Sequence, residues 1–412
     1  MANKNLIKAT ILFVDLVDSI ELANYWDSKK YNDCLNEFQR CMLNGIDLWR
    51  KRIKEIKIVG DELLVLFSSK NIKTDIGNAI DLAVYLKILW WISSTNRKRI
   101  IEGKKIFDLG IGINTGKVMA DNRPYRKGMK KLAPKRKTLE GFAISLAKRI
   151  ETFSRQGKYS KIMLGHNSVA EFNKLYHNYE FEYVGLQKLK GLAQEIPIFE
   201  LKSSYTESAE SIAKYKNLGW IIKQLKHIRD ADPSNIWLYM VLINIYAHKG
   251  NYKRVEKLCK EAIAIDNTVA NIHYELAIAL NKQKRYDESL LYSDRAINLS
   301  PNLWHLYDEK INALIFEGSY EECIKTCKYV ISHAPEWYIK YHSDWVYYDM
   351  AAAYARKGDK INAFKNLRKA VKIGGGEIIH YLKEDEDRDF YNLYDDPQYK
   401  KIIQVKVRKI KR

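Results

Sequence analysis

Two aspartates at the ends of strand-like segments are the first residues of this sequence that could do chemistry. Asp15 closes the apolar run "ILFVDL", and Asp61 lies at the tip of a predicted hairpin, "KIVGDELLVLF", over residues 57–67. An acid at the end of an apolar strand is costly unless it is paired or bound to a metal. Two carboxylates on adjacent strand ends can hold Mg²⁺ or Mn²⁺ of the kind that binds triphosphate oxygens. Gly-Asp is also ordinary turn chemistry, so Asp61 could equally be a solvated turn residue.

Alternating strand and helix patterns surround these aspartates as far as about residue 202. Strands are expected at the hairpin, at "ATILFVDL", at "FDLGIGINTG" and, shorter, at "KIMLG", "FEYVGL" and "IPIFEL". Helical periodicity appears over residues 20–49 and 76–94 and in "LEGFAISLAKRIETF". The pattern predicts an α+β domain with a largely antiparallel sheet.

Repeated helical units replace the strands from about residue 203. Gly250, Lys284 and Gly318 are spaced by 34 residues each, which is the tetratricopeptide length. Gly358 follows after 40 residues, which predicts a short insertion near residues 337–342. We predict a linker and capping helix over 203–235 and an all-α tetratricopeptide-like solenoid over 236–412. The concave surface of such an array implies a protein or peptide partner, or an intramolecular regulatory contact.

Length, cysteine number and hydropathy limit the class of protein. A chain of 412 residues fits two or three domains. Its five cysteines are odd in number and lack metal-type pairing, so we expect reduced core residues in a cytoplasmic protein. A strand that begins at Ala9 leaves no room for a signal peptide. Residues 76–92 are apolar but contain Asp81 and Lys87, so we expect a buried helix and no membrane span.

The net charge of +20 raises the question of nucleic acid as a partner. Much of the excess lies in the run "RPYRKGMKKLAPKRK" over residues 123–137 and in the tail "KVRKIKR" over residues 406–412. No helix-turn-helix or RNA-binding signature accompanies either run. A solvated face is the commoner meaning of such runs, followed by attraction to polyanions such as nucleoside triphosphates. A nucleic-acid-binding protein is therefore the last-ranked hypothesis.

Five motifs in order resemble the catalytic domain of the class III nucleotidyl cyclases. They are "FVDLVDS", "KIVGDELLVLF", "GIGINTG", "EGFAISLAKRIE" and "LKG…IPIFEL", and they extend over about residues 7–202. Each motif is weak alone, whereas five in one order are specific. The resemblance implies a ferredoxin-like cyclase domain over residues 1–202. It also implies an enzyme that converts a nucleoside triphosphate to a 3′,5′-cyclic nucleotide and pyrophosphate.

The resemblance assigns catalytic roles to residues that match the family's motifs. Asp15 and Asp61 match the two aspartates that hold two divalent ions, Mn²⁺ or Mg²⁺. One ion would lower the pKa of the ribose 3′-hydroxyl and the other would clamp the triphosphate. Arg149 matches the arginine that stabilises the transition state, and Lys190 matches the lysine that contacts the terminal phosphates. Ser145 stands where the family has a transition-state asparagine, which implies slower catalysis or a reorganised site.

The same resemblance leaves the base open. Lys57 and Thr138 match the base-reading positions, and this pair occurs in some bacterial adenylyl cyclases, which makes GTP the least favoured substrate. A second branch, the pyrimidine cyclases of bacterial anti-phage signalling, makes cyclic UMP or cyclic CMP. That branch has an arginine where Arg52 stands but a second arginine in place of Lys57. A bulky Ile53 after Arg52 could narrow the pocket for a small base, or it could be an ordinary strand residue. Cyclic AMP and cyclic UMP or CMP therefore stand as equal alternatives.

The family forms its active sites between two catalytic domains arranged head to tail. A homodimer is therefore implied, in which Asp15 and Asp61 of one chain face the base-reading, transition-state and phosphate-binding residues of the other. The alternative is a catalytically weak scaffold that acts through its repeats. Retention of Asp15, Asp61 and Arg149 disfavours the scaffold, and Ser145 keeps it open.

Overall fold

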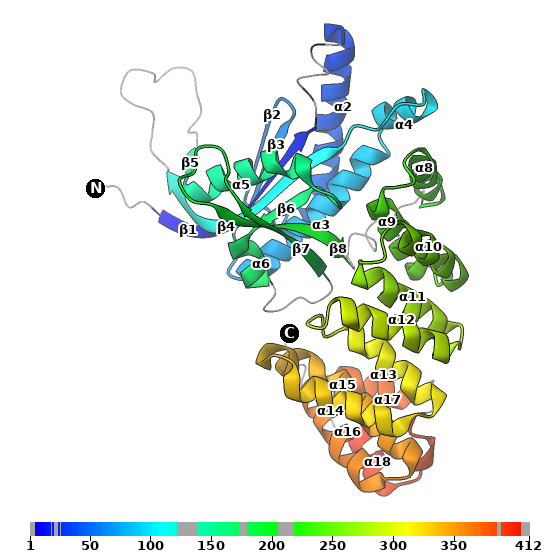
Figure 1. Cartoon of the computed structure of the whole chain (residues 1–412). Coiled ribbons are helices and arrows are strands. Elements are labelled where there is room, and N and C mark those ends of the chain that lie inside the picture. The colour runs from blue at the N-terminus through cyan, green and yellow to red at the C-terminus, as the bar shows by residue number, and fades with distance from the viewer. Residues whose placement is uncertain are drawn as a thin grey trace. The chain divides into compact units, whose positions relative to one another are not determined.

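The computed structural model of the chain describes residues 5–17, 19, 24, 26–121, 138–172, 179–204, 218–384 and 389–404. The chain separates into two compact units, residues 1–248 and residues 249–412. The sheet lies in the first unit, and the second unit is helical (Figure 1). The basic run 123–137 and the tail 406–412 lie outside the described residues.

One mixed sheet forms the centre of the first unit. Its strands follow the order β2-β3-β1-β4-β6-β8-β7, with β5 added against β4. The pairing of β4 with β6 is parallel, and the other described pairings are antiparallel. The strand bounds are β1 Asn5–Leu16, β2 Glu55–Val59, β3 Glu62–Phe67, β4 Leu109–Asp121, β5 Thr138–Glu140, β6 Ile162–Gly165, β7 Tyr179–Gln187 and β8 Ile196–Ser204. The predicted hairpin and the α+β class are confirmed.

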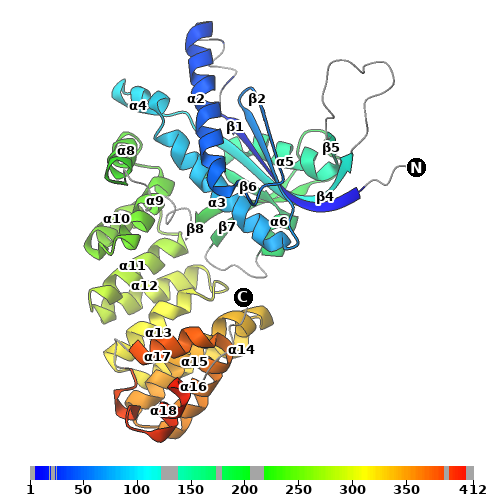
Figure 2. The ribbon, with the colours of Figure 1, turned by 180° about the vertical axis from the view of Figure 1, so that it is seen from behind.

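Helices cover both faces of this sheet, as the two opposite views show (Figures 1 and 2). The described residues of the first unit form the helices α2 Ser28–Ile46, α3 Ile72–Trp91, α4 Ser94–Ile101, α5 Phe142–Phe153, α6 His166–Phe172, α8 Leu218–Ala231 and α9 Ile236–His248, with short 3₁₀ turns Asp47–Trp49 and Ser154–Gln156. Side chains of β1 alternate between the faces. Ile11 and Phe13 pack with Ala147 of α5 in one apolar cluster, so α5 covers the face on which Asp15 also lies.

The predicted helix over 76–94 corresponds to α3, which begins four residues earlier and ends at Trp91. Helix α4, which follows it, was not predicted. Asn71 caps α3 by accepting from the backbone N–H groups of Lys73 and Thr74, and Ser93 starts α4 by accepting from Asn96. Helix α3 is buried along nearly its whole length. Taken singly, none of the helices that the structure describes is long and apolar enough to cross a membrane. The bent pair α3 and α4 meets that test of length and composition only when taken together.

Glycines in β4 set how closely α5 approaches the sheet. A Cβ atom at Gly112 would stand 2.3 Å from the backbone nitrogen of Glu151, and one at Gly116 would stand 2.7 Å from the Cβ of Ala143. Contacts this short require the backbone of α5 to move. The "GIGINTG" motif therefore places α5 directly on β4, beside Asp15 of the neighbouring strand β1.

The second unit consists of antiparallel helices in series. They are α10 Tyr252–Ile265, α11 Ala270–Lys282, α12 Tyr286–Leu299, α13 Leu306–Glu317, α14 Tyr320–His333, α15 Glu336–Lys357, α16 Lys360–Gly374, α17 Gly376–Glu384 and α18 Pro397–Ile403, with a 3₁₀ turn Tyr391–Leu393. Positive φ is found at all four positions from which the repeat spacing was read, Gly250, Lys284, Gly318 and Gly358. The predicted insertion lies inside α15, which is 22 residues long. The tetratricopeptide-like class is confirmed.

A buried acid in this unit gives a test of its packing. The side chain of Glu275 in α11 is 3% exposed, and its Oε2 atom has no hydrogen-bond partner in the part of the chain that the structure describes. Burial, with a smaller effect of the charge of Glu309, raises the pKa of Glu275 to about 8 from an ordinary value of 4.5. The raised pKa contributes to the free energy of unfolding in full below about pH 4.5, where Glu275 is protonated in both the folded and the unfolded chain. This contribution is lost as the pH rises toward 8.

We therefore expect Glu275→Gln to stabilise the protein by about 1–3 kcal/mol at about pH 8.5 and to have little effect at about pH 5. Urea unfolding at both pH values measures this difference. Glu256→Gln is the matched control with the opposite sign. Although burial opposes it, hydrogen bonds from Lys260, Arg285 and Gln283 lower the pKa of Glu256 to about 2. Glu256→Gln should therefore lower the free energy of unfolding by about 1 kcal/mol at the higher pH. Equal effects of Glu275→Gln at both pH values would contradict the assignment.

Candidate functional site

Asp15 lies at the end of β1, between Glu62 of β3 and Gly110 of β4. It is 9% exposed, and its Oδ2 atom lies 3.5 Å from the ammonium of Lys148 and 3.2 Å from Nη2 of Arg155. Burial raises the pKa of Asp15 most, and the nearby negative charge of Asp61 raises it further against the opposing charge of Lys148. A cation bound at this carboxyl group would oppose both effects, because an opposite charge favours the ionised form.

Lys148 of α5 is a cation that the sequence analysis did not single out. Its ammonium lies 2.6 Å from Glu62 and 2.9 Å from Glu151, in addition to its contact with Asp15. Glu151 is fully buried, and burial raises its pKa to about 7 even though Lys148 lowers it. Lys148 and Glu151 are three residues apart, a spacing at which side chains on one helix can pair, so this ion pair could have been predicted from the sequence. The contacts of Lys148 with Asp15 and Glu62 cross more than 80 residues, so no local pattern could reveal them.

Asp61 follows Gly60 in the tight turn between β2 and β3, where Gly60 has φ +63°. Gln39 of α2 donates to the carbonyl of Gly60 at 2.9 Å and so ties the turn to that helix. The charge of Asp61 acts on Asp15 and contributes to the raised pKa of Tyr31, after burial. Asp61 directly precedes Glu62, which pairs with Asp15 across β1 and β3, so the two predicted partners lie near each other.

Lys57 lies on β2, the edge strand of the sheet, opposite Leu64. Leu64 in turn pairs with Phe13, so Lys57 projects from the same face of the sheet as Asp15. Lys57 and Arg52 are both exposed, but Arg52 donates to Asn78 of α3 at 2.7 Å. The described part of the hairpin thus offers Lys57 as its exposed base-contacting candidate.

A second group of predicted residues gathers on a different side of α5. Nε of Arg149 donates to the backbone carbonyl of Lys190 at 2.5 Å, and Nη1 donates to the carbonyl of Ser145 at 3.2 Å. A Cβ at Gly191 would stand 3.3 Å from Nη2 of Arg149, so this glycine leaves room for the guanidinium. Thr138 begins β5 and pairs with Asp121 of β4.

The two groups diverge because Lys148 and Arg149 are consecutive in a helix. Consecutive helical side chains point about 100° apart. Lys148 therefore points to Asp15 and its neighbours, while Arg149 points to the loop of Lys190. Within the described residues, no hydrogen bond or ion pair joins Asp15 or Asp61 to Arg149. The predicted site residues of one chain thus fall into two separate groups.

The carboxylates can be tested for their fit to a divalent ion. Among the residues that the structure describes, no group of three or more His, Cys, Asp or Glu is arranged to hold a metal. Mg²⁺ commonly takes one or two carboxylates and completes its shell with water and substrate phosphates. Asp15 and Asp61 fit that pattern, and the ammonium of Lys148 already lies against Asp15. Lys148 would therefore compete with a metal ion for the same carboxylate.

We expect Lys148→Met to raise the affinity for Mn²⁺ about tenfold, because it removes a competing positive charge and frees the carboxylates. Titration of free Mn²⁺ by electron paramagnetic resonance, without nucleotide, measures this affinity. Lys70→Met removes the same charge from an exposed loop lysine of the same unit and serves as the control. Equal Mn²⁺ affinities of Lys148→Met and Lys70→Met would show that Lys148 does not occupy the ion's place.

Comparison with known proteins gives a family match for the first half of the chain. The family described as the adenylate and guanylate cyclase catalytic domain matches residues 1–203. The search of curated proteins returned no match.

Solved structures resemble each half separately. The adenylyl cyclase CyaB from P. aeruginosa is 20% identical over 49% of this chain and 97% of that chain, with a TM-score of 0.40. The guanylate cyclase domain of RhGC from Catenaria anguillulae, in complex with GTP, is 15% identical over 48% of this chain and 98% of that chain, with a TM-score of 0.39. The C-terminal region resembles YrrB, a tetratricopeptide repeat protein with an unusual peptide-binding site. That match is 22% identical over 44% of this chain and 90% of that chain, with a TM-score of 0.36.

Proposed function

Residues 1–203 belong to the adenylate and guanylate cyclase catalytic domain family, and we propose from this that the protein is a metal-dependent nucleotidyl cyclase. It would convert a nucleoside triphosphate to a 3′,5′-cyclic nucleotide and pyrophosphate. The observation that carries the proposal is the pair of half-sites on α5. Asp15 and Asp61 lie on one side of this helix, and Arg149 and Lys190 lie on another.

The chain's own residues supply binding and charge stabilisation in this proposal. Asp15 and Asp61 would hold a divalent ion, which when bound acts as a Lewis acid toward the triphosphate and the ribose hydroxyl. Arg149 has a planar fork of donors that suits the charge on the α-phosphate as the ribose 3′ oxygen attacks it in line. Lys190 would bind the terminal phosphates, which leave as pyrophosphate. The 3′ proton goes to solvent.

Two half-sites on one chain support a homodimer in which each active site takes one half from each chain. The face of the sheet that carries Lys57 also carries Val59, which is 61% exposed, and Phe142 at the start of α5 is 62% exposed. Large apolar side chains with this exposure are typical of surfaces that a partner covers. Lys57 and Thr138 of one chain would then read the base of a nucleotide whose triphosphate is bound, through the divalent ion, by Asp15 and Asp61 of the other.

For the base of the triphosphate substrate, adenine and a pyrimidine are the two alternatives that we propose. Lys57 can donate to a ring acceptor of either kind. Incubation of the purified dimer with Mn²⁺ and each of the four triphosphates, followed by mass analysis, separates the products. We expect cyclic AMP, cyclic UMP or cyclic CMP, and a cyclic pyrimidine product would favour a role in antiviral signalling.

A scaffold is the second candidate, because Lys148 lies against the carboxylates and Ser145 replaces the family's asparagine. In that case the repeats, which we propose bind a protein or peptide, carry the function. Absence of every cyclic product from a preparation shown to be dimeric would overturn the cyclase proposal and favour the scaffold.

A further inference from the structure

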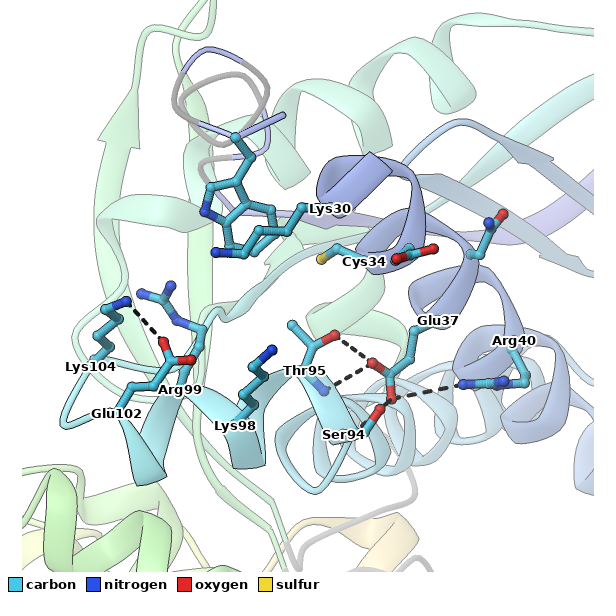
Figure 3. A pocket seen from close by; sticks show the side chains of 13 residues that line it. Lys30, Cys34, Glu37, Arg40, Ser94, Thr95, Lys98, Arg99, Glu102 and Lys104 are labelled. Carbon is cyan, nitrogen blue, oxygen red and sulfur yellow. Dashed lines mark hydrogen bonds and ion pairs between the residues drawn. The ribbon is translucent and has the colours of Figure 1, made fainter. Parts of the chain in front are cut away.

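A cavity of about 470 Å³ lies between α2 and α4, away from the residues of the proposed cyclase site (Figure 3). Small-molecule sites in proteins commonly enclose about 300–1,000 Å³, so the cavity has the size of a binding site. Its walls come from the first half of α2, from Trp26 just before it, and from α4 with the turn that follows. All of these segments belong to the first unit.

Glu37 holds the two walls together. Its carboxylate accepts from the backbone N–H groups of Ser94 at 2.7 Å and Thr95 at 2.9 Å, and from both of their hydroxyls. Although burial opposes it, these hydrogen bonds lower the pKa of Glu37. Its negative charge is therefore committed to the first turn of α4, with Arg40 3.9 Å away. Figure 3 shows these bonds at the end of the cavity opposite Lys104.

The remaining charges of the cavity are mainly positive. Glu102 pairs with Lys104 at 2.8 Å. Lys30 of α2 and Lys98 of α4 form no ion pair within the described residues. Arg99 donates from Nε to the carbonyl of Lys105, and its guanidinium lies 3.7 Å from the centre of the Phe107 ring. No hydrogen bond to a described residue is made by its other guanidinium nitrogens, which can donate to a ligand. Asp33 and Glu102 are the other acids of the lining, and the charge of Glu102 acts on all three of these cations as well as on Lys104. The lining still carries more cations than acids. The excess of positive charge favours an anion.

One wall of the cavity is flat and largely uncharged. The rings of Trp26 and Phe107 pack edge to face, with their centres 5.4 Å apart. The ammonium of Lys30 lies 4.6 Å from the centre of the Trp26 ring. Cys34 is buried, and burial raises the pKa of its thiol to about 11, so it is an uncharged surface at neutral pH. An indole beside cations is suited to a ligand that combines a ring with an anionic group.

We propose that this cavity is a second binding site, for a small organic anion that carries a flat ring. Lys30, Lys98 and Arg99 contact the anionic group, and Trp26 contacts the ring. Neither Asp61 nor Arg149 belongs to the cavity, so binding there is independent of cyclase chemistry.

Helix α4, which lines this cavity, also contacts α8, the helix that precedes the repeats. Arg97, next to Lys98, places its guanidinium 5.0 Å from the centre of the Trp220 ring in α8. A ligand that draws Lys98 and Arg99 toward α2 restrains the same helix that holds Trp220. Ligand binding is therefore expected to slow amide hydrogen exchange in α8 as well as in α4.

Isothermal titration of the full chain without divalent metal tests the site with three probes. Adenosine 5′-monophosphate carries both ring and anion, adenosine carries the ring, and inorganic phosphate carries the anion. We expect the monophosphate to bind at least about tenfold more tightly than either part alone. Equal affinity for inorganic phosphate would overturn the role of Trp26, and no binding of the monophosphate would overturn the site.

Variants separate this cavity from the cyclase site. Lys98→Glu should weaken monophosphate binding at least about tenfold, and the milder Lys30→Gln about threefold. Lys70→Glu reverses the same charge outside the cavity and should change nothing. Arg149→Ala should also leave binding intact, whereas loss of binding in Arg149→Ala with retention in Lys98→Glu would assign the ligand to the cyclase site and overturn the proposal. Unchanged exchange in α8 upon binding would overturn the coupling through Arg97.

Discussion

Asp61→Ala is expected to lower turnover by about 10³-fold while the folded domain persists. Asp61 is half-buried in the turn between β2 and β3 and acts on Asp15 through its charge. Its removal would leave Asp15 as the single remaining aspartate for a divalent ion that holds the triphosphate. The loss should appear in kcat and in the Mn²⁺ concentration needed for half-maximal rate.

The turn itself should survive this substitution. Gly60 keeps the positive φ that the turn needs, and Gln39 still donates to its carbonyl. We therefore expect a change in the free energy of unfolding within about 0.5 kcal/mol. Asp47→Ala removes an exposed acid from the same unit and is the control for net charge. Activity of Asp61→Ala close to that of Asp47→Ala would refute the assignment of Asp61 as a metal ligand.

A second readout follows from the electrostatics of the pair. The charge of Asp61 is one of the causes that raise the pKa of Asp15, after burial. Asp61→Ala should therefore move the pKa of Asp15 toward its ordinary value, which carbon-detected NMR of the carboxyl group can follow in the absence of metal. This shift tests the proximity of the two aspartates without relying on activity.

The sequence predicted the elements that local pattern determines. The hairpin, the strand that ends at Asp15 and the glycine-rich strand β4 each follow from alternation and turn residues over fewer than about fifteen positions. The frame from Gly250 to Gly358 was visible because each repeat ends a helix with a positive φ. Even Lys284 adopts this conformation in place of glycine.

What the sequence could not predict depends on contacts between distant segments. Lys148 and Arg155 reach Asp15 across 133 and 140 residues, and their types alone mark them as ordinary surface cations. Helix α4 was not predicted, because its eight residues, "STNRKRII", are mostly polar and show no apolar periodicity. The cavity between α2 and α4 has Glu37 in its lining, which bonds to the start of α4 across 57 and 58 residues. Tertiary structure, not local propensity, forms each of these features.

Arg149→Ala is expected to lower turnover about 10²–10³-fold, since it removes the donor aimed at the transition state in the proposed site. The same guanidinium also holds the carbonyl of Lys190, so part of the loss could come from a displaced loop. Arg149→Lys separates the two effects, because lysine keeps the charge but cannot make the forked set of bonds. A rate for Arg149→Lys near that of the native chain would show that only charge matters there.

Mixing the two inactive chains tests the arrangement of half-sites directly. Lys148 and Arg149 point to different sides of α5, so a chain that lacks Asp61 still has an intact Arg149 half-site, and the reverse holds for Arg149→Ala. After subunit exchange, half of the dimers are heterodimers, and each contains one site with both halves intact. About a quarter of native activity should therefore return. Verified heterodimers that remain inactive would place Asp61 and Arg149 in the same site of one chain, whereas recovery requires that each active site be built from two chains.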